Sequence, residues 1–545
     1  MPRSTAHRIL AVGLLAACLA VPGFACTNYI VTRGASADGS VNVTYSADSH
    51  TLYGELYYTP AREHLDGEML DVCEWDTGKY LGRIRQVPKT FAVVGNMNEH
   101  QLVIGETTFG GRKECEGGKG SMDYGGLIYI TLQRAKTARE AIRIMGEFVK
   151  EYGYVSEGET FSIADANEAW IMDLIGKGPD AKGAVWVARR VPDGYICAHA
   201  NQARIRQFPL DDPENCLFAP DVISFAREKG FFKGEDKDFS FVDAYAPPDF
   251  GALRACEARV YAFFNRAAPS LKLPTDYVMG NPKAEPLPLW IKPDRKLSVR
   301  DVMELMRDHF EGTPMDMTKD IGAGPYVAPY RWRPMTWKVD GQEYFNERAT
   351  STQQTGFSFV SQARSWLPDP IGGVLWFGVD DTFSTVYFPA YCGIREIPHN
   401  FAVGTGDFGH FTWESAWWVF NFVANTAYSR YCDMIKDIQV VQRELEGQFA
   451  SAQPTVEAEA LAIHKESPDR ARAFLTAYSC RVAEQTVKRW RKLGESLLVK
   501  YLDGNVRDEK GNVKHPGYPE SWYRAILKAH PDQFKVPRTD QPQTH

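Results

Sequence analysis

The residue with the clearest chemical potential in this 545-residue chain is Cys26. It follows a segment typical of a secretory signal peptide, with Arg3 and Arg8 near the start and an uncharged apolar run over 9–21. Ala25 places a small residue directly before the cysteine. If the chain is cut after Ala25, one terminal residue carries both a thiol and a free α-amino group. A nucleophile and a base on one residue suggest acyl-transfer chemistry.

A free α-amino group has a pKa of about 7.7–8.0, so at pH 7–8 a fraction of it is neutral and can accept the thiol proton. The thiolate would attack an amide carbonyl, and water would later release the thioester. Such a site needs a carboxylate to hold the amine and donors for the oxyanion. Asp48, at the end of a predicted strand over 41–48, is the candidate carboxylate, and Asn201 is the candidate donor. A turn aspartate and a loop amide bonded to backbone are the alternatives.

A cysteine directly after a leader also has a second interpretation, the lipid acylation seen in bacterial lipoproteins. Their signals usually have an aliphatic residue three positions before the cysteine and small residues at the two positions between that residue and the cysteine. This chain has Gly23 and Phe24 at those positions, which is a poor match. Acylation of the sulfur would remove the nucleophile, so the two hypotheses exclude each other. An uncleaved anchor is disfavoured because the apolar run is shorter than the roughly 20 residues that span a bilayer.

Composition excludes several other classes of function. The chain has 62 basic and 69 acidic residues and a net charge of −7, so nucleic acid is not expected as a partner. No segment after the leader is apolar for long enough to predict a membrane span. The sequence contains no HExxH, CxxC or GxSxG motif, and we therefore expect no metal, no cofactor and no serine-hydrolase elbow. A homo-oligomer is left open.

Two further patterns are open to more than one interpretation. With Cys18 and Cys26 set aside, eight cysteines remain, which could pair in an oxidising compartment or stay as free buried thiols. Gly404, Gly406 and Gly409 fit the glycine spacing of a dinucleotide-binding loop. The βαβ context of that loop is missing, so a loop that leads into the C-terminal helices is favoured.

Hydrophobic periodicity predicts a first part rich in strands and a helical last part. Strands are expected over 27–32, 41–48, 52–59, 91–95, 102–107, 160–164, 169–174, 185–190, 356–362, 373–379 and 385–388. Helices are expected over 137–150, 253–265, 298–310, 413–448 and 468–501. Long strand runs with inserted helices favour an α+β fold. We expect a signal peptide over 1–25, a catalytic domain over 26–411 and a helical extension over 412–545.

Several segments carry a resemblance to a known family. They are CTNYIV from Cys26, GASADGS over 34–40, GNMNEH over 95–100, IAD and EAW within 163–170, WLPDP over 366–370 and WFGVDD over 376–381. This set resembles the mature secreted cysteine dipeptidases, which belong with the choloylglycine and penicillin V acylases among the N-terminal-nucleophile hydrolases. The helical C-terminal part is also similar to the dipeptidase branch.

The resemblance implies a four-layer αββα sandwich with the nucleophile at the start of a central strand, and hydrolysis of dipeptides without a metal. By position, Cys26 matches the nucleophile, Asp48 its acidic partner and Asn201 the oxyanion asparagine. Thr108 falls where the acylases place a further oxyanion residue.

The chain departs from the acylase pattern at Tyr45, where the acylases carry an arginine, and Arg348 is the candidate for a second arginine expected later in the chain. These departures speak against acylase substrates more than against peptide hydrolysis. The sequence therefore predicts a cysteine-type dipeptidase exported to the periplasm or beyond, with dipeptides as its partners. The alternatives are a hydrolase of N-acyl amides such as conjugated bile acids or penicillin V, and a lipid-anchored surface binding protein acylated on Cys26.

Overall fold

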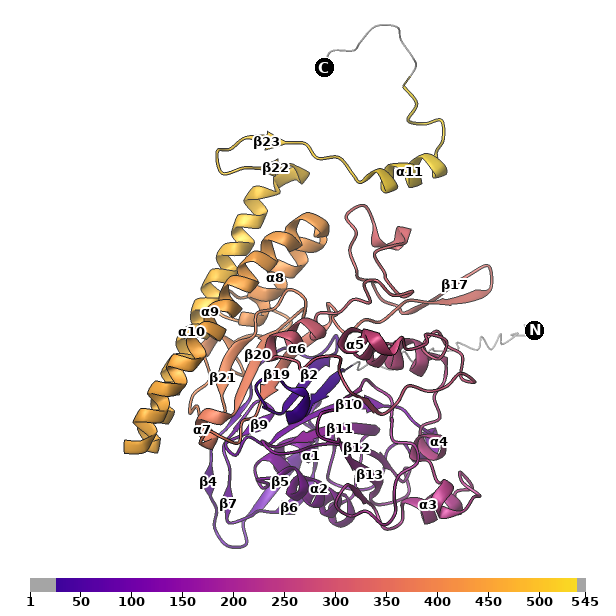
Figure 1. The fold of residues 1–545 in the computed structure, drawn as a ribbon, viewed down its shortest axis with the longest axis vertical. Helices are drawn as coiled ribbons and strands as arrows, with labels where there is room; N and C mark the ends of the chain where they lie inside the picture. The colour runs from indigo at the N-terminus through magenta and orange to yellow at the C-terminus, as the bar shows by residue number, and fades with distance from the viewer. Residues whose placement is uncertain (1–25, 537–545) are drawn as a thin grey trace, which may run out of the picture.

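The computed structural model describes residues 26–536, so the predicted signal peptide over 1–25 lies outside the described residues. Two antiparallel sheets form the centre of the molecule (Figure 1). The first sheet has seven strands. In spatial order they are β16 (Trp290–Ile291), β14 (Ile196–His199), β1 (Asn28–Val31), β2 (Asn42–Asp48), β19 (Thr355–Gln362), β20 (Val374–Val379) and β21 (Phe388–Tyr391).

The second sheet has eight strands, and its middle strands pack against β1 and β2 of the first sheet. In spatial order they are β15 (Cys216–Phe218), β13 (Ala184–Arg190), β12 (Ala169–Gly176), β11 (Gly158–Ala164), β10 (Val103–Phe109), β9 (Met97–Asn98), β8 (Val93–Val94) and β3 (Tyr58–Thr59). Every residue of β2, β11 and β12 is buried, because each of these strands is covered on both faces.

Helices cover the outer face of each sheet, which completes the four layers and confirms the predicted αββα fold (Figure 1). The second sheet is covered by α1 (Tyr124–Leu132) and α2 (Ala138–Tyr152). The first sheet is covered by α5 (Ala258–Ala267), α6 (Val299–Met306), α8 (Ala416–Tyr428), α9 (Tyr431–Glu466) and α10 (Pro468–Lys500). No helix within residues 26–536 is both long enough and apolar enough to be a candidate membrane span.

The remaining elements lie outside the two central sheets. Four two-stranded sheets pair β4 (Arg62–Glu63) with β7 (Lys89–Thr90), β5 (Met69–Cys73) with β6 (Tyr80–Arg85), β17 (Thr336–Val339) with β18 (Gln342–Phe345), and β22 (Val506–Arg507) with β23 (Val513–Lys514). The short helices are α3 (Val222–Glu228), α4 (Phe241–Tyr245), α7 (Asp369–Gly372) and α11 (Glu520–Ala529). The nine described cysteines are all free, so the pairing left open by the sequence is not formed here.

The prediction of one continuous helix over 413–448 is wrong. The chain breaks between α8 and α9 at Arg430, whose backbone leaves the helical region at φ −151° and ψ 59°. The Arg430 side chain bonds to Asp433 and to the carbonyl of Gly504, which fixes the break. The expected strand over 52–59 is also wrong, because only Tyr58 and Thr59 pair with a neighbouring strand.

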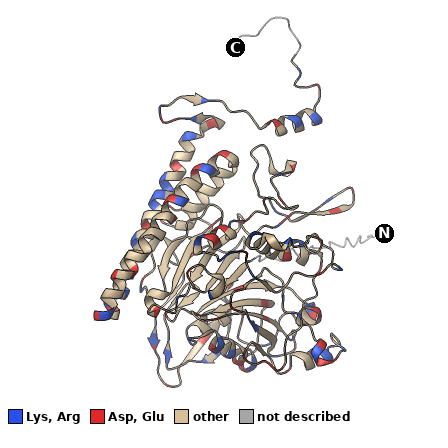
Figure 2. Ribbon diagram, in the orientation of Figure 1, with Lys and Arg blue, Asp and Glu red and all other residues tan. Residues whose placement is uncertain are grey.

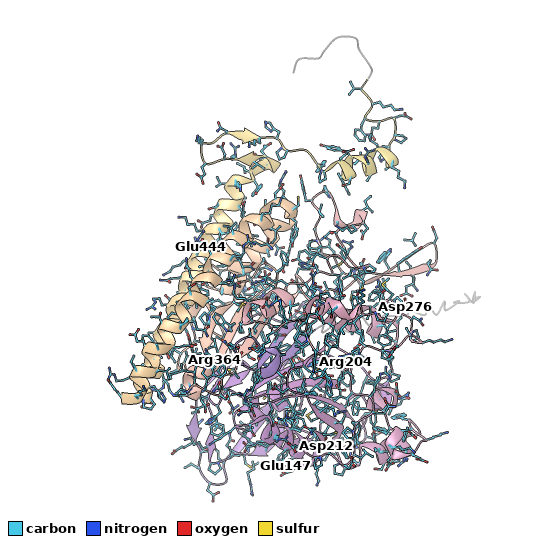
Figure 3. The ribbon with its side chains drawn as sticks, in the orientation of Figure 1. Glu147, Arg204, Asp212, Asp276, Arg364 and Glu444 are labelled. Carbon is cyan, nitrogen blue, oxygen red and sulfur yellow. The ribbon has the colours of Figure 1, made fainter. Side chains whose placement is uncertain are left out.

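The C-terminal helices are attached to the first sheet by buried ion pairs. The Arg364 guanidinium, labelled in Figure 3, lies 2.7 Å from Glu457 Oε1 and donates to Oε2 at 2.8 Å. Glu457 belongs to α9, and Arg364 follows β19. Most other charges of α9 and α10 lie along the outside of these helices, whereas the central strands carry few (Figure 2). The pair therefore joins two layers that also meet through buried hydrogen bonds, such as those from Gln442 and Ser479 to backbone carbonyls of the sheet side.

We expect Glu457→Gln to lower the free energy of unfolding by about 3 kcal/mol, because it leaves the buried Arg364 guanidinium without its counter-charge. The shift of the urea unfolding midpoint measures this effect. Glu466→Gln is the matched control, since it removes the exposed Arg470 pair of the same helix and should change stability by less than about 0.5 kcal/mol. Equal midpoints for the two variants would show that the Arg364 pair does not hold the helices in place.

Candidate active site

Cys26 lies just before the central strand β1 of the first sheet, and it is held there because the next residue pairs with β2. The backbone of Thr27 exchanges two hydrogen bonds with Ser46 of β2, at 3.2 and 2.9 Å, before β1 begins at Asn28. This pairing sets Cys26 beside the last residues of β2, where Tyr45 and Asp48 lie. The start of the mature chain predicted from the sequence is thus tied to the centre of a sheet, which restrains an end that would otherwise fray.

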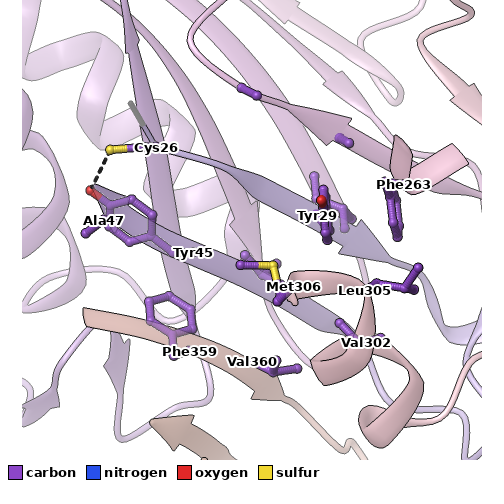
Figure 4. Close-up of a cluster of buried hydrophobic side chains, with 14 of the residues drawn as sticks. Cys26, Tyr29, Tyr45, Ala47, Phe263, Val302, Leu305, Met306, Phe359 and Val360 are labelled. Carbon is purple, nitrogen blue, oxygen red and sulfur yellow. Dashed lines mark hydrogen bonds between the residues drawn. The ribbon is translucent and has the colours of Figure 1, made fainter. Parts of the chain in front are cut away.

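The Cys26 sulfur is enclosed by polar groups, with only 4% of the residue exposed. Sγ lies 3.8 Å from the Tyr45 hydroxyl, as drawn in Figure 4, and 3.8 Å from Glu106 Oε1. Burial raises the pKa of the thiol well above its ordinary value, and the Glu106 and Asp48 carboxylates raise it further. A hydrogen bond from the Asp48 backbone N–H, and the hydrogen bond between the thiol and the Tyr45 hydroxyl, oppose this effect. The thiol therefore needs a base before it can attack at neutral pH.

The structure brings Asp48 and Arg348 together. Asp48 accepts hydrogen bonds at Oδ1 from Ser46 and Thr355, each at 2.6 Å, and its Oδ2 lies 2.6 Å from Nη2 of Arg348. Both members of the ion pair are almost completely buried. Arg348 thus lies next to the predicted acidic partner of the nucleophile, and its described contacts are with that carboxylate and with the Ala349 carbonyl.

Arg259 is a central residue of the site that the sequence did not reveal. From α5 its Nη1 donates to the Cys26 carbonyl at 2.6 Å and to Thr27 Oγ1 at 2.8 Å, while Nη2 donates to Asn201 Oδ1 at 2.9 Å. Burial and the nearby Arg348 lower the pKa of Arg259 to about 10. The sequence shows only an arginine within the expected helix over 253–265, and its complete burial is seen only in the structure.

Asn201 and Thr108 lie together next to the nucleophile. Asn201 has a left-handed backbone, with φ of 55°, and its Nδ2 donates to the Thr108 carbonyl at 2.6 Å. The contact with Arg259 at Oδ1 fixes which end of the amide is the donor. Thr108 lines the same cavity as Cys26, whereas Asn201 is not among the lining residues. Their roles at the oxyanion stay predictions.

A pair of buried acids forms the second unpredicted part of the site. Glu106 of β10 accepts a hydrogen bond from the Tyr45 hydroxyl, and Glu159 of β11 accepts one from Thr108 Oγ1 at 3.1 Å. Burial raises the pKa of both carboxyl groups, and the neighbouring Glu106 raises that of Glu159 well above the usual range. The Oε2 atom of each carboxyl group has no hydrogen-bond partner within the described residues. Their only trace in the sequence is one acid in each of two apolar strands.

The sulfur opens into a cavity of ≈ 340 Å³ between the two sheets and the loops that follow β2. Its lining includes four carboxylates and a set of aromatic rings, and no Lys, Arg or His. The carboxylates are Asp48, Glu55, Asp76 and Glu106, and the rings belong to Tyr45, Tyr53, Tyr57, Trp75, Tyr124, Tyr129 and Phe357. The cavity thus presents negative charge and flat apolar walls to whatever binds beside Cys26.

The alternative sites considered from the sequence lie elsewhere. Gly404, Gly406 and Gly409 lie in turns between η7 (His399–Phe401) and α8, which is the loop that was favoured over a dinucleotide site. Within the described residues, no three His, Cys, Asp or Glu side chains gather as metal ligands would.

We expect Tyr45→Phe to slow alkylation of Cys26 by iodoacetamide about 10-fold at neutral pH, because it removes a hydrogen bond worth about 1.4 kcal/mol to the sulfur. Since that bond lowers the thiol pKa, its loss raises the pKa and reduces the thiolate fraction at a fixed pH. The rate-against-pH curve should move to higher pH while its plateau stays the same. A lower plateau with an unmoved curve would contradict this role.

Comparison with known proteins agrees with the site. A model of peptidase family C69 matches residues 25–444. A probable dipeptidase of Salmonella dublin is 25% identical over 391 residues, which are 68% of this chain and 82% of that protein. A dipeptidase of Bifidobacterium longum is 28% identical over 389 residues, 59% of this chain and 70% of the relative. A probable dipeptidase A of Streptococcus pyogenes serotype M18 is 23% identical and covers 81% of this chain and 89% of its own. These matches confirm the resemblance and the predicted class of cysteine-type peptidase.

Proposed function

Since the chain belongs to peptidase family C69, we propose that it is an exported dipeptidase that becomes active when Cys26 is freed as the N-terminal residue. The observation that carries the proposal is the position of Cys26, buried at the start of a central strand with its sulfur facing a closed-in cavity. A volume of ≈ 340 Å³ is at the lower end for small-molecule sites, which suits a dipeptide and not a protein chain. The names of the relatives support the same substrate class.

The proposed reaction begins with transfer of the thiol proton to the α-amine of Cys26. The sulfur then attacks the carbonyl carbon of the first residue, and the ammonium returns its proton to the leaving nitrogen as the C–N bond breaks. This step leaves a thioester and releases the second amino acid. Water, deprotonated by the same amine, attacks the thioester, the C–S bond breaks, and the thiol regains its proton. The first amino acid leaves as a carboxylate.

The surrounding residues have supporting roles in this proposal. Asp48 orients the terminal amine, and Arg348 balances the charge of that carboxylate. Arg259 holds the carbonyl of Cys26 and thereby fixes the angle at which the thiol meets the cavity. Asn201 and Thr108 stabilise the oxyanion together with backbone N–H groups. While Ala25 is bonded to Cys26, the nitrogen is an amide and has no basic lone pair, so the uncut chain is a precursor.

Substrate assays on the purified mature protein test the proposal. We expect release of amino acids from dipeptides and at least about 100-fold lower kcat/KM for penicillin V and a conjugated bile acid. Faster turnover of the acyl amides than of any dipeptide would instead assign an acylase. Fractionation of the source cells tests export, with the mature form expected in the periplasm or medium. Recovery of the protein in the membrane fraction, diacylated on Cys26, would reject both export as a soluble enzyme and the mechanism.

A further inference from the structure

We propose that Glu106 binds the α-ammonium group of the substrate, and that this contact restricts the enzyme to peptides with a free amino terminus. The inference rests on the proposed dipeptidase function and assigns a recognition role to a residue that has no place in the steps described above. It makes Glu106 a specificity-determining residue and gives the site a class of preferred ligand, an α-ammonium next to the scissile carbonyl.

The distance between the nucleophile and this carboxylate fits the shape of an amino-terminal residue. In any α-amino acid residue the nitrogen lies roughly 2.5 Å from its own carbonyl carbon, given standard bond lengths and angles. A sulfur ready to attack lies about 3–3.5 Å from that carbon, so the ammonium falls within roughly 6 Å of the sulfur. Glu106 Oε1 is 3.8 Å from Sγ, which leaves room for an ammonium–carboxylate hydrogen bond of about 2.8 Å.

The buried carboxylate of Glu106 has no basic side chain beside it, among the residues described, that would balance a negative charge. Its side chain is 2% exposed, and it forms no ion pair with any Lys, Arg or His within residues 26–536. Its Oε2 atom has no hydrogen-bond partner within the described residues, and burial raises the pKa of the carboxyl group. A buried carboxylate without a counter-ion is costly, and an incoming ammonium would supply that counter-ion.

Each of the other acids of the cavity also has a partner, as Glu106 has in the Tyr45 hydroxyl, but Oε2 of Glu106 has no hydrogen-bond partner in the described part of the chain. Asp48 is paired with Arg348, Glu55 accepts from the Gly404 backbone, and Asp76 accepts from the Tyr124 hydroxyl at 2.8 Å. These acids nevertheless add to the negative potential of a cavity whose lining has no basic residue. Glu106 alone among them is recorded within hydrogen-bond distance of the nucleophilic sulfur.

A pair of substrates that differ only in the ammonium group tests the proposal. We would measure kcat/KM of the mature protein for Phe-Ala and for its des-amino analogue, 3-phenylpropionyl-Ala. Rates are expressed per reactive Cys26, counted by iodoacetamide labelling of the folded protein and mass spectrometry of the peptide that contains Cys26, so unfolded protein is not counted. Glu106→Gln should lower kcat/KM for Phe-Ala about 100-fold, as expected when one partner of a buried charge pair is removed, and should change that for the analogue less than about 3-fold.

Two further variants complete the experiment. Glu106→Asp keeps the charge on a shorter side chain and should recover part of the preference for Phe-Ala. Glu157→Gln, which removes a half-buried acid outside the cavity, is the matched control and should leave both rates unchanged.

Three results would overturn the inference. If Glu106→Gln lowered kcat/KM equally for both substrates, Glu106 would serve the chemical step or the amine of Cys26. If kcat/KM for Phe-Ala were unchanged, Glu106 would not bind the substrate. Both of these leave the dipeptidase proposal intact. Absence of any dipeptide turnover by the unaltered mature protein would overturn the proposed function and this inference together.

Discussion

Cys26→Ser is expected to fold and to be processed normally, and to lose at least about 1000-fold in kcat/KM for dipeptides. The hydroxyl fits the space of the thiol and can keep the contact with Tyr45. It is a far weaker nucleophile, because the neighbouring amine cannot draw the proton from an alcohol as readily as from a thiol. Steady-state kinetics on the purified mature variant measure this loss.

Cys392→Ser provides the matched control for that variant. Cys392 is equally buried, and burial raises its pKa to about 12, but it lies outside the cavity and donates to the carbonyl of Asp369. A serine can make the same bond, so activity should stay within about 3-fold of the unaltered protein. Near-normal dipeptide turnover by Cys26→Ser would contradict the assignment of the nucleophile.

Asp48→Asn is expected to lower the free energy of unfolding by about 3–5 kcal/mol as well as to impair activity. Asp48 is the carboxylate that faces Arg348 at 2.6 Å, and the positive charge of Arg348 also acts on the buried Arg259 and on Arg333. Loss of the Asp48 charge leaves the buried guanidinium groups of Arg348 and Arg259 to repel each other, with the exposed Arg333 nearby. Urea unfolding of the mature variant measures the loss.

The double variant Asp48→Asn with Arg348→Met separates the charge effect from the shape of the site. Since it removes the unpaired guanidinium as well, it should recover at least about half of the lost stability. Ser46→Ala, which removes only one hydrogen bond to the Asp48 carboxylate, should cost about 1 kcal/mol. If Asp48→Asn alone were as stable as the unaltered protein, the Asp48–Arg348 ion pair would contribute no net stability.

The layered fold was predictable because its strands and helices have clear hydrophobic patterns. The strands that carry Cys26 and Asp48 were found within a few residues, as was α2, which has a capping threonine and one apolar face. Helix α1 was missed because it is buried almost all round and has two glycines in its first turn, so it has no amphipathic period. The break at Arg430 depends on contacts with Asp433 and a distant carbonyl, which no local pattern indicates.

The site was predictable only in part, and the reason is physical. Cys26 is marked by its place after a predicted leader, and Asp48 by its place at the end of the neighbouring strand. Glu106 and Arg259 come from segments far away in sequence, and neither stands out there: Glu106 is one acid in a short strand, and Arg259 is one of several charged residues in its helix. Such a residue becomes recognisable only when the fold shows which group balances its charge.

The central claim is that cleavage before Cys26 creates the nucleophile and its base on one residue. Peptide mass spectrometry of the active protein isolated from its source tests this claim most directly. We predict an N-terminal peptide that begins at Cys26 and carries an unmodified amine and thiol. An active protein whose first residue precedes Cys26, or whose Cys26 is acylated, would contradict the account.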